Sequence, residues 1–383
     1  MQKTKRIILF LDASRGFGRG MLSGVARYSA LNGPWNFYRK PPAYLEKEQS
    51  NLEELQTWNP DGIICSIAQA EELTQLDVPI IGYDPGTYSG LIPCVASGHA
   101  EAGRLAAQHL LDLGHRAFAF CGFNTLNWSQ ERCRAFCTAI EEAGAKVHIY
   151  RGSAKNTAWS QDEPHIQEWI KSIPKPVGMF CVNDDRAASL IESCRILEYG
   201  VPEDISVIGV DDDEYICELQ NPPLSSIRIA SEQAGYDAAA LLNQIIDGKE
   251  EMSSQRIIAH ATGITPRQST DVLMVKNTEV RKALRFIREN VNQPIRVSDV
   301  IAATALSHRT LNEHFHSELG CSIVKQLTRA RIDYISRLLT DTDLRISEIA
   351  AAVGYEDDRH FSRYFKRATT LTPQAYRRKL TPP

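Results

Sequence analysis

Short polar side chains gather directly after several apolar runs of this 383-residue chain. Asp12-Ala-Ser-Arg15 follows the first run, and Asn183-Asp-Asp185 and Asp211-Asp-Asp213 follow two later ones. Aromatic residues, among them Phe17 and Trp128, stand nearby. Carboxylates, amides and arginine hydrogen-bond hydroxyl groups, while aromatic rings pack against apolar C–H faces. The combination predicts a site for a small ligand with many hydroxyl groups, and a sugar fits this description.

The elements that would position these residues alternate along residues 7–264. Short apolar runs are typical of strands, and the amphipathic stretches between them are typical of helices. This alternation predicts parallel sheets covered by helices, in which ligands bind beyond the carboxyl ends of the strands. The expected strands are Ile7–Leu11, Gly62–Ser66, Pro79–Gly82, Ala117–Cys121, Val147–Tyr150, Gly178–Val182 and Ser206–Val210, and the expected helices include Gly20–Leu31, Ala100–Leu113, Gln130–Ala143 and Asp185–Tyr199.

We therefore expect ligand contacts from side chains at or near the ends of these strands. The alternative is structural, because Asp and Asn also gather at strand ends to form turns and helix caps. The candidates from this placement are Asp12, Ser14, Arg15, Phe17, Asp84 and Trp128.

A helical unit occurs twice in the last hundred residues. Arg296–Phe315 and Arg345–Phe365 each contain a short helix, a tight turn and a second helix with a polar outer face. This is the pattern of a helix-turn-helix, and two such units about one helical turn of DNA apart can read successive major grooves. The repeat predicts that the chain binds double-stranded DNA with sequence specificity.

Apolar spacing within the repeat indicates which side chains face outward. Leu311 with Phe315, and Phe361 with Phe365, are expected to point inward. Arginine can bind guanine through two hydrogen bonds and asparagine can bind adenine likewise, with phosphate contact or a solvated face as the alternative. The expected DNA-binding residues are His308, Arg309, Asn312, Arg359, His360, Ser362, Arg363 and Lys366.

Charge is distributed unevenly along the chain. From Lys276 to the end there are 19 Lys and Arg against 12 Asp and Glu, a balance of +7, whereas the remainder has 24 against 35, a balance of −11. Phosphate contacts supply most non-specific affinity for nucleic acids, so a basic block after an acidic body favours a DNA-binding module.

Composition excludes several other classes. A chain with 43% hydrophobic and 23% charged residues is ordinary globular protein. No stretch approaches the roughly 18 apolar residues of a membrane span and no signal peptide is evident, so we expect a cytoplasmic protein without membrane contact. The nine cysteines predict buried reduced thiols. Cys133 and Cys137 can share a helix face, but no second pair has metal-ligand spacing, so we expect neither metal nor cofactor.

Several segments of the body carry a family resemblance. They are Leu113–Gly122, Arg132–Gly144, Phe180–Asp184, Val207–Asp212 and Asn221–Ser226. Together they resemble the effector-binding core of the LacI/GalR regulators, which implies two α/β lobes joined by crossing strands, with the ligand between them. The resemblance also places Arg132, Asn183 and Asp211 where that family contacts its sugar. Ser97-Gly-His99 departs from the Asp-Asn pair usual in the family.

A second resemblance covers residues 278–380. It is carried by Ile346–Tyr355, His360–Lys366 and Thr372–Arg377, which are similar to the AraC/XylS family. A periplasmic-type core followed by an AraC-type tail is the order found in the xylose-operon activators, and the chain resembles that family over nearly its whole length. The resemblance implies D-xylose as effector, direct-repeat DNA half-sites, a homodimer and activation through RNA polymerase.

Local details of the repeat predict how its helices begin and end. Ser298 and Ser347 stand where an N-cap would satisfy free backbone amides. The first turn has Ala305 where the second has Gly354, and a left-handed alanine would cost about 1 kcal/mol. Thr370 also replaces a glycine common before the final Thr-Pro. We therefore expect the first unit to be the weaker reader of DNA.

These observations together predict the architecture. We expect an α/β two-lobed periplasmic-binding-protein-like sensor domain, followed by an all-α domain with two helix-turn-helix units. The sensor would span residues 1–265, with lobes of about 5–114 and about 115–227 and a further crossing after that. A linker over 266–277 would lead into the helical domain over 278–380.

Other functions have less support. Gly16-Phe-Gly-Arg-Gly20 follows a strand but lacks the Gly-x-Gly-x-x-Gly spacing of a dinucleotide-dependent enzyme, and hydrolase and phosphate-loop motifs are absent. A phosphorylated receiver domain would need about half the length of this body. We therefore expect no enzyme. The serious alternative is the same architecture responding to another pentose, a hexose or a polyol.

Overall fold

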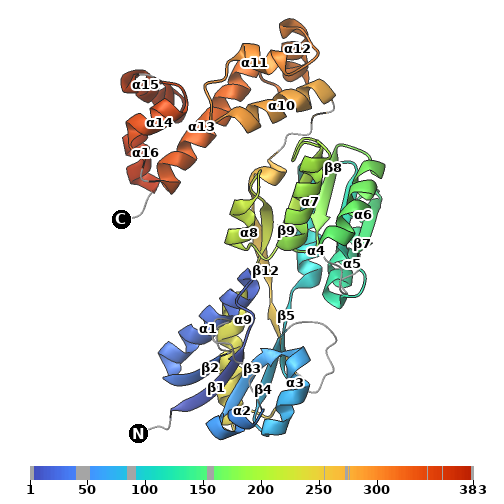
Figure 1. The fold of residues 1–383 in the computed structure, drawn as a ribbon, viewed down its shortest axis with the longest axis vertical. Coiled ribbons are helices and arrows are strands. Elements are labelled where there is room, and N and C mark those ends of the chain that lie inside the picture. Colours follow the sequence, from blue (N-terminus) through green and yellow to red (C-terminus); the bar gives the residue numbers. More distant parts are fainter. Residues whose placement is uncertain are drawn as a thin grey trace. The chain divides into compact units, whose positions relative to one another are not determined.

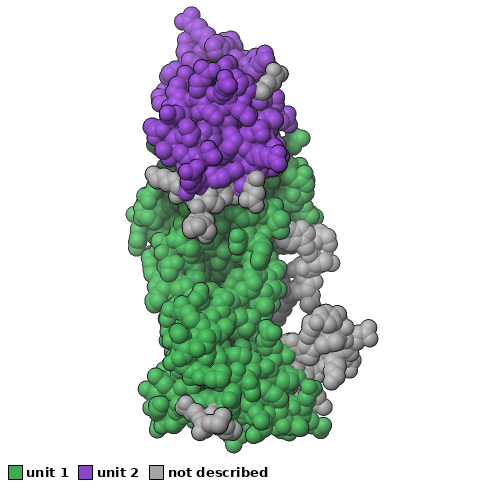
Figure 2. Space-filling model, turned by 90° about the vertical axis from the view of Figure 1, so that its left-hand side faces the viewer, with its two compact units in different colours: residues 1–198, 206–271 green, residues 199–205, 272–383 purple. Residues whose placement is uncertain are grey.

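The computed structural model describes residues 4–39, 52–83, 92–152, 159–253, 255–271, 275, 277–342, 344–355 and 357–380. The chain divides into two compact units, which Figure 2 colours separately. The α/β unit comprises Met1–Glu198 and Ser206–Asp271, and the helical unit comprises Tyr199–Ile205 and Val272–Pro383.

The α/β unit contains two six-stranded sheets, and the first sheet builds one lobe (Figure 1). Its strand order is β11-β5-β4-β3-β1-β2, with parallel pairing throughout. The strands are β1 (Lys5–Phe10), β2 (Trp35–Arg39), β3 (Gly62–Ser66), β4 (Ile80–Tyr83), β5 (Cys94–Ser97) and β11 (Arg256–Ala259). The helical elements are α1 (Gly16–Asn32), α2 (Leu52–Trp58), α3 (Ile67–Leu73), η1 (Thr74–Leu76) and α9 (Ser231–Ile246).

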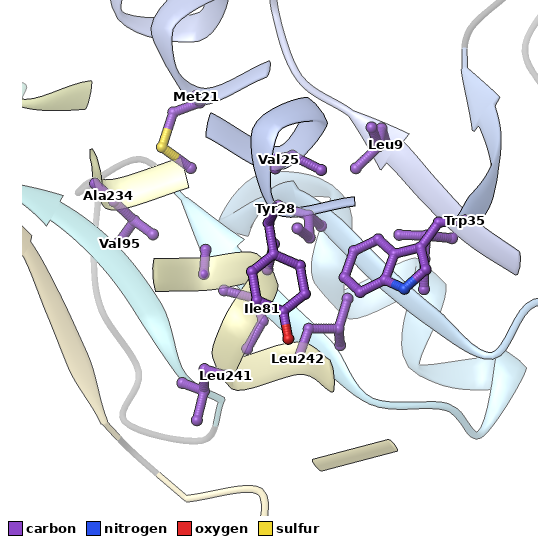
Figure 3. Close-up of a cluster of buried hydrophobic side chains, with 14 of the residues drawn as sticks. Leu9, Met21, Val25, Tyr28, Trp35, Ile81, Val95, Ala234, Leu241 and Leu242 are labelled. Carbon is purple, nitrogen blue, oxygen red and sulfur yellow. The ribbon is translucent and has the colours of Figure 1, made fainter. Parts of the chain in front are cut away.

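Helices α1 and α9 pack closely over one face of this sheet. Figure 3 shows the core beneath them, where the rings of Tyr28 and Trp35 have centroids 5.3 Å apart. Glycines make the close approach possible. A Cβ at Gly24 would lie 2.0 Å from a backbone oxygen of α9, and one at Gly235 would lie 2.2 Å from the backbone oxygen of Met21. Glycine in this first helix therefore serves helix packing.

The second sheet builds the other lobe, in the order β12-β10-β9-β8-β6-β7. Strands β10 and β12 pair antiparallel, whereas β10 with β9, and β6 with β7 and β8, pair parallel. The strands are β6 (Phe118–Phe123), β7 (Val147–Gly152), β8 (Val177–Cys181), β9 (Ile205–Val210), β10 (Ser225–Ile229) and β12 (Ala261–Thr265). The helices are α4 (His99–Asp112), α5 (Asn127–Glu142), α6 (Trp159–Ser172), α7 (Asp184–Ile196) and α8 (Glu214–Leu219).

The chain crosses between the lobes three times: after β5, after β10 and between β11 and β12. The sequence analysis placed residues up to about 114 in the first lobe. Helix α4 instead packs Ala102, Ala106 and Leu110 into the core of the second lobe, against Phe136 of α5. The first crossing thus lies at Gly98. The two-lobed α/β architecture itself is confirmed.

The helical unit contains seven helices among its described residues. They are α10 (Thr278–Asn290), α11 (Val297–Ala302), α12 (His308–Leu319), α13 (Ile323–Asp341), α14 (Ile346–Ala352), α15 (Asp358–Thr369) and α16 (Pro373–Leu380). Two cores form, and α13 contributes Ile323 and Leu327 to the first and Ile335 and Leu339 to the second. This shared helix joins the pair α11–α12 to the pair α14–α15.

Residues Tyr199–Ile205, which follow α7 and end at the first residue of β9, cluster with the helical unit. Asp204 accepts a hydrogen bond from Arg281 of α10 at 3.0 Å. Glu203, with 1% of its side chain exposed, pairs with Arg288. Burial raises the pKa of Glu203, and the charge of Arg288 opposes that rise. In the expected linker, residues 272–274 and 276 lie outside the described residues, while Val275 packs into the first core.

Candidate ligand site and nucleic-acid interface

Arg132 is buried at the carboxyl edge of the second sheet. It lies on α5, is 3% exposed and donates to the backbone oxygen of Val182, directly after β8. Its Nη2 atom is 3.6 Å from Oδ1 of Asp211, and its guanidinium lies over the ring of Trp128, 5.3 Å from the centroid. Burial lowers the pKa of Arg132, and Asp211 opposes this shift. Three predicted ligand residues are thus brought together.

Asp211 has an unusual backbone conformation. Its φ is +106°, a value that residues other than glycine rarely adopt, and its N–H donates to the backbone oxygen of Ile227 at 2.9 Å. Burial raises the pKa of the Asp211 carboxyl, whereas Arg132 lowers it. The side chain remains 23% exposed, so a carboxylate paired with a buried guanidinium can still be reached from solvent.

Asn183 lies beside this group but also has a structural role. It is the N-cap of α7, and its Oδ1 accepts a hydrogen bond from the backbone N–H of Arg186 at 3.0 Å. The capping interpretation therefore applies to its amide oxygen. Its amide NH2 can still donate to a ligand.

The candidates after β1 belong to the opposite lobe. Oδ1 of Asp12 accepts from the backbone N–H of Ser14 at 2.8 Å, which is the turn role considered for it. Ser14 is exposed, while Phe17 is half-buried and packs against the core between α1 and α9. Nε of Arg15 donates to Oδ2 of Asp185 in the second lobe at 2.7 Å. Asp84 lies outside the described residues.

Asp213 joins the two lobes, and the sequence analysis did not single it out. Its carboxylate, on the second lobe, accepts from the backbone N–H of Gly16 at 2.7 Å and from Arg19 at 2.6 Å, both on α1. Gly16 leaves room for this approach, because a Cβ there would lie 3.2 Å from the Cα of Asp213. The sequence feature that could have indicated its role is its position as the third acid in the run Asp211–Asp213, directly after an expected strand.

Asp184 is a buried acid that hydrogen-bonds the backbone of Asp213. It is 2% exposed, accepts from the backbone N–H of Asp213 at 2.8 Å and also accepts from the hydroxyl of Ser226. Burial, and next the charge of Asp211, raise the pKa of Asp184 well above its usual range. This buried carboxyl fixes the loop after β9 on which Asp211 and Asp213 lie.

In the first helix-turn-helix pair, α12 presents some of its predicted DNA-binding residues. His308 is exposed, and Arg309 has 88% of its side chain exposed while pairing with Glu313 at 2.9 Å. Asn312 is half-buried, and its Oδ1 accepts from the backbone N–H of Ile323 at the start of α13, at 3.2 Å. Its amide oxygen is therefore engaged within the protein.

In the second pair, α15 presents a strongly cationic face. Phe361 and Phe365 are fully buried, as predicted, and so the opposite side chains face outward. Ser362 is half-buried, and Nε2 of His360 is 3.9 Å from Asp357. The exposed cationic residues are Arg359, Arg363, Lys366 and Arg367.

Two predictions about the repeat are wrong. Ser298 and Ser347 are not N-caps, because each lies inside its helix. Asp299 and Glu348 instead reach back and accept from the backbone N–H groups of Arg296 and Arg345, each at 2.6 Å, and so satisfy the helix start.

Of the two positions where the sequence analysis noted a missing glycine, only Ala305 differs from expectation. Ala305 is not among the residues with positive φ, and its N–H donates to Glu279 at 2.7 Å, so the predicted strain is absent there. Thr370, by contrast, has a φ of +68°.

The described residues also bear on membrane and metal sites. No helix among them is long and apolar enough to cross a bilayer. Within the same part of the chain, no group of three or more His, Cys, Asp or Glu side chains is arranged to hold a metal ion. The Sγ atoms of Cys133 and Cys137 lie 3.9 Å apart on α5, and the cysteines are free.

Comparison with known proteins matches each of the two units to a known domain family. Residues 107–270 match the periplasmic binding protein-like domain family, and residues 300–379 match a helix-turn-helix domain family. The chain is 30% identical over 393 residues to the xylose operon regulatory protein of Escherichia coli (strain K12), covering 98% of this chain and 97% of that one. It is 27% identical over 386 residues to the protein of the same name from Haemophilus influenzae, covering 97% and 98%.

Solved structures agree with these matches. The chain aligns over its whole length, and over the whole of the other chain, with the xylose-binding transcription activator xylR at a TM-score of 0.85 and 29% identity. A LacI family transcriptional regulator from Enterococcus faecium with bound ribose matches 70% of this chain and 98% of its own, at a TM-score of 0.55 and 21% identity. The second match supports the fold of the α/β unit.

Proposed function

Because the chain belongs to the family of the xylose operon regulatory proteins, we propose that it activates a sugar catabolism operon in response to D-xylose. The observation that carries this proposal is the full-length match, in which the α/β unit and the helix-turn-helix domain occur in the same order. Like its relatives, the chain is a DNA-binding transcription regulator and not an enzyme. What we propose beyond this is D-xylose as the effector and activation as the response. We also propose that the protein acts in the cytoplasm, where its DNA would be.

The arrangement around Arg132 supports a sugar as ligand. The guanidinium of Arg132 and the carboxylate of Asp211 offer donors and acceptors to hydroxyl groups, and Trp128 offers an aromatic face to C–H groups. Ser14 and Arg15 would contribute from the first lobe. A ligand that contacts both lobes stabilises the arrangement in which they are close, because it binds that arrangement better than the open one.

The response to the ligand would pass to the helical domain. We propose a homodimer in which two copies of the helical unit bind direct-repeat half-sites and contact RNA polymerase. Within each copy, α12 and α15 would enter successive major grooves. Arg309, Arg359 and Arg363 are the proposed base readers, with Lys366 on phosphate. The engaged oxygen of Asn312 leaves only its NH2 for a base.

Calorimetric titration tests the proposed effector. D-xylose should bind more tightly than L-arabinose, D-ribose, D-glucose or xylitol. Asp211→Asn, which keeps the shape and tolerates positive φ, should weaken binding by about tenfold or more, since removing a charged partner costs about 1.5–3 kcal/mol. Asp247→Asn is the matched control, because Asp247 pairs with Lys5 at the other end of β1.

The possible results separate the alternatives. Tighter binding of another pentose, a hexose or a polyol would keep the regulator and replace the effector. If Asp211→Asn binds D-xylose as tightly as the wild type does, the ligand site is not the one proposed around Arg132. No binding by any of the five compounds would refute a sugar of this class as effector.

A further inference from the structure

His99 is a buried histidine with unused hydrogen-bonding capacity. It is the first residue of α4, directly after the crossing at Gly98, and it is 4% exposed. Neither ring nitrogen has a hydrogen-bond partner among the residues that the structure describes. Burial of a polar group without a partner costs free energy, so a buried group of this kind calls for an explanation.

The position of His99 suggests where its partner comes from. Helices α4 and α5 pack together, and a Cβ at Gly103, one turn after His99, would lie 2.5 Å from the backbone oxygen of Arg132. The charge of Arg132 contributes to the lowered pKa of His99, which indicates that the two side chains are near each other. Nε of Arg132 also lacks a partner among the described residues. The imidazole of His99 and the Nε atom of Arg132 are thus unsatisfied polar groups at the proposed ligand site.

The ionisation state of His99 defines the kind of group it can bind. Burial, and next the charges of Arg132 and Arg256, lower the pKa of His99 to about 3. The imidazole is therefore neutral near pH 7, with one nitrogen that donates and one that accepts. A hydroxyl group both donates and accepts, so it matches a neutral imidazole better than a carboxylate or phosphate does.

We propose that His99 is a ligand-binding residue that hydrogen-bonds one hydroxyl group of the sugar, on the side of the site where the chain crosses between the lobes. The inference rests on the proposed function and adds a specificity-determining contact to it. On this view the free protein keeps an unsatisfied imidazole, and the bound sugar satisfies it.

His115 provides a matched control within the same lobe. It is also 4% exposed, and neither of its ring nitrogens has a partner among the described residues. A Cβ at Gly178, near the start of β8, would lie 3.1 Å from the His115 ring, so His115 is at the edge of the sheet opposite Arg132. Replacement of His115 therefore reproduces the loss of a buried histidine without touching the proposed site.

The experiment titrates wild-type protein, His99→Phe and His115→Phe with D-xylose and its monodeoxy analogues. His99→Phe should bind D-xylose about 10-fold to 100-fold more weakly, because a ligand hydroxyl loses its buried partner. One deoxy analogue should bind wild-type protein weakly, and His99→Phe should change its affinity by less than about twofold, as expected for a lost partner. His115→Phe should leave every affinity within about twofold of wild type. His99→Gln, which can donate and accept, should restore part of the affinity.

Thermal unfolding without ligand completes the test. An apolar ring of similar shape should not lower the unfolding temperature at position 99, because it removes an unsatisfied polar group. If His99→Phe fails to fold, His99→Ala takes its place in the titrations. Wild-type affinity for D-xylose in these variants, or an equal loss across all deoxy analogues, would overturn the proposal for His99 while leaving the effector intact. Failure of wild-type protein to bind any of the sugars would instead refute the proposed function and this inference with it.

Discussion

Asp184 and Asp211 are neighbouring carboxyl groups, the first fully buried and the second partly exposed, whose roles differ because their partners differ. Asp184 accepts from Ser226 and from the backbone of Asp213, and it holds the loop after β9 in place. Asp211 instead faces the guanidinium of Arg132 and remains partly exposed. Burial raises the pKa of both groups. The first therefore positions the site, and the second is available to a ligand.

Among the exposed residues of α15, Arg359 and Lys366 should have separable roles. Arg359→Ala should relax base preference at one position and cost about 1–3 kcal/mol at the preferred base. Lys366→Ala should weaken all sequences about equally and reduce the dependence of log K on log salt by about one, because one phosphate contact is lost. Binding to a set of operator variants at several salt concentrations measures both effects. Identical behaviour of the two variants would contradict the assigned reading face.

The ends of α12 and α15 occupy equivalent places in the two repeats but have different residues. Gly320 ends α12 with a φ of +63°, and a Cβ there would meet no atom within 4 Å. Thr370 ends α15 in the same left-handed region, with a φ of +68°. A residue with a Cβ is strained in this conformation and glycine is not. The second repeat therefore carries strain that the first avoids, and the predicted weakness of the first turn at Ala305 has no such basis.

Exchanging the residues at these two helix ends should have opposite effects. Thr370→Gly should stabilise the helical unit by about 1 kcal/mol, and Gly320→Ala should destabilise it by about the same amount. Urea unfolding followed by circular dichroism measures both changes. Tryptophan fluorescence is the control, because the five tryptophans lie between Trp35 and Trp169, in the α/β unit. A stabilising Gly320→Ala would show that backbone strain does not decide these positions.

Two ion pairs between described residues, which differ in burial, join the two lobes of the α/β unit. Arg19 pairs with Asp213, whose side chain is 3% exposed, whereas the Arg15 and Asp185 side chains are 53% and 41% exposed. Solvent and salt screen the exposed pair more strongly, so it contributes less free energy. The pair between Arg19 and Asp213 should therefore contribute more to holding the lobes together around a ligand.

Effector affinity should depend unequally on these two pairs. Arg19→Met should weaken D-xylose binding by about tenfold, because closure would leave Asp213 without its cation. Asp185→Asn, which removes the charge that pairs with Arg15, should weaken it by less than about threefold. Arg27→Met is the control, since Arg27 pairs with Glu232 within the first lobe and is exposed. Calorimetric titration measures all three affinities. Equal losses for Asp185→Asn and Arg19→Met would argue against burial as the deciding factor.

The sequence predicted the helices and strands correctly where their hydrophobic pattern lies within one continuous segment. Each of the seven expected strands is present with ends shifted by two residues at most, and the inward aromatic residues of both repeats are buried. The strands β2, β5, β10, β11 and β12 were not expected. They are short strands of four or five residues, and several lie where the chain passes between lobes, so their burial depends on neighbours distant in the sequence.

Sequence patterns therefore determined the α/β class of the body, the order of the two domains and the outward face of α15, because hydrophobic periodicity and helix-turn-helix spacing are properties of consecutive residues. The two-lobed form was implied by the resemblance to the LacI/GalR regulators. The same resemblance marked Arg132 and Asp211 as candidates. Only the tertiary structure decided which polar groups meet. The bond from Gly16 to Asp213 spans 197 positions and that from Arg15 to Asp185 spans 170. Such contacts depend on how two sheets and three crossings bring distant segments together, which no local pattern encodes.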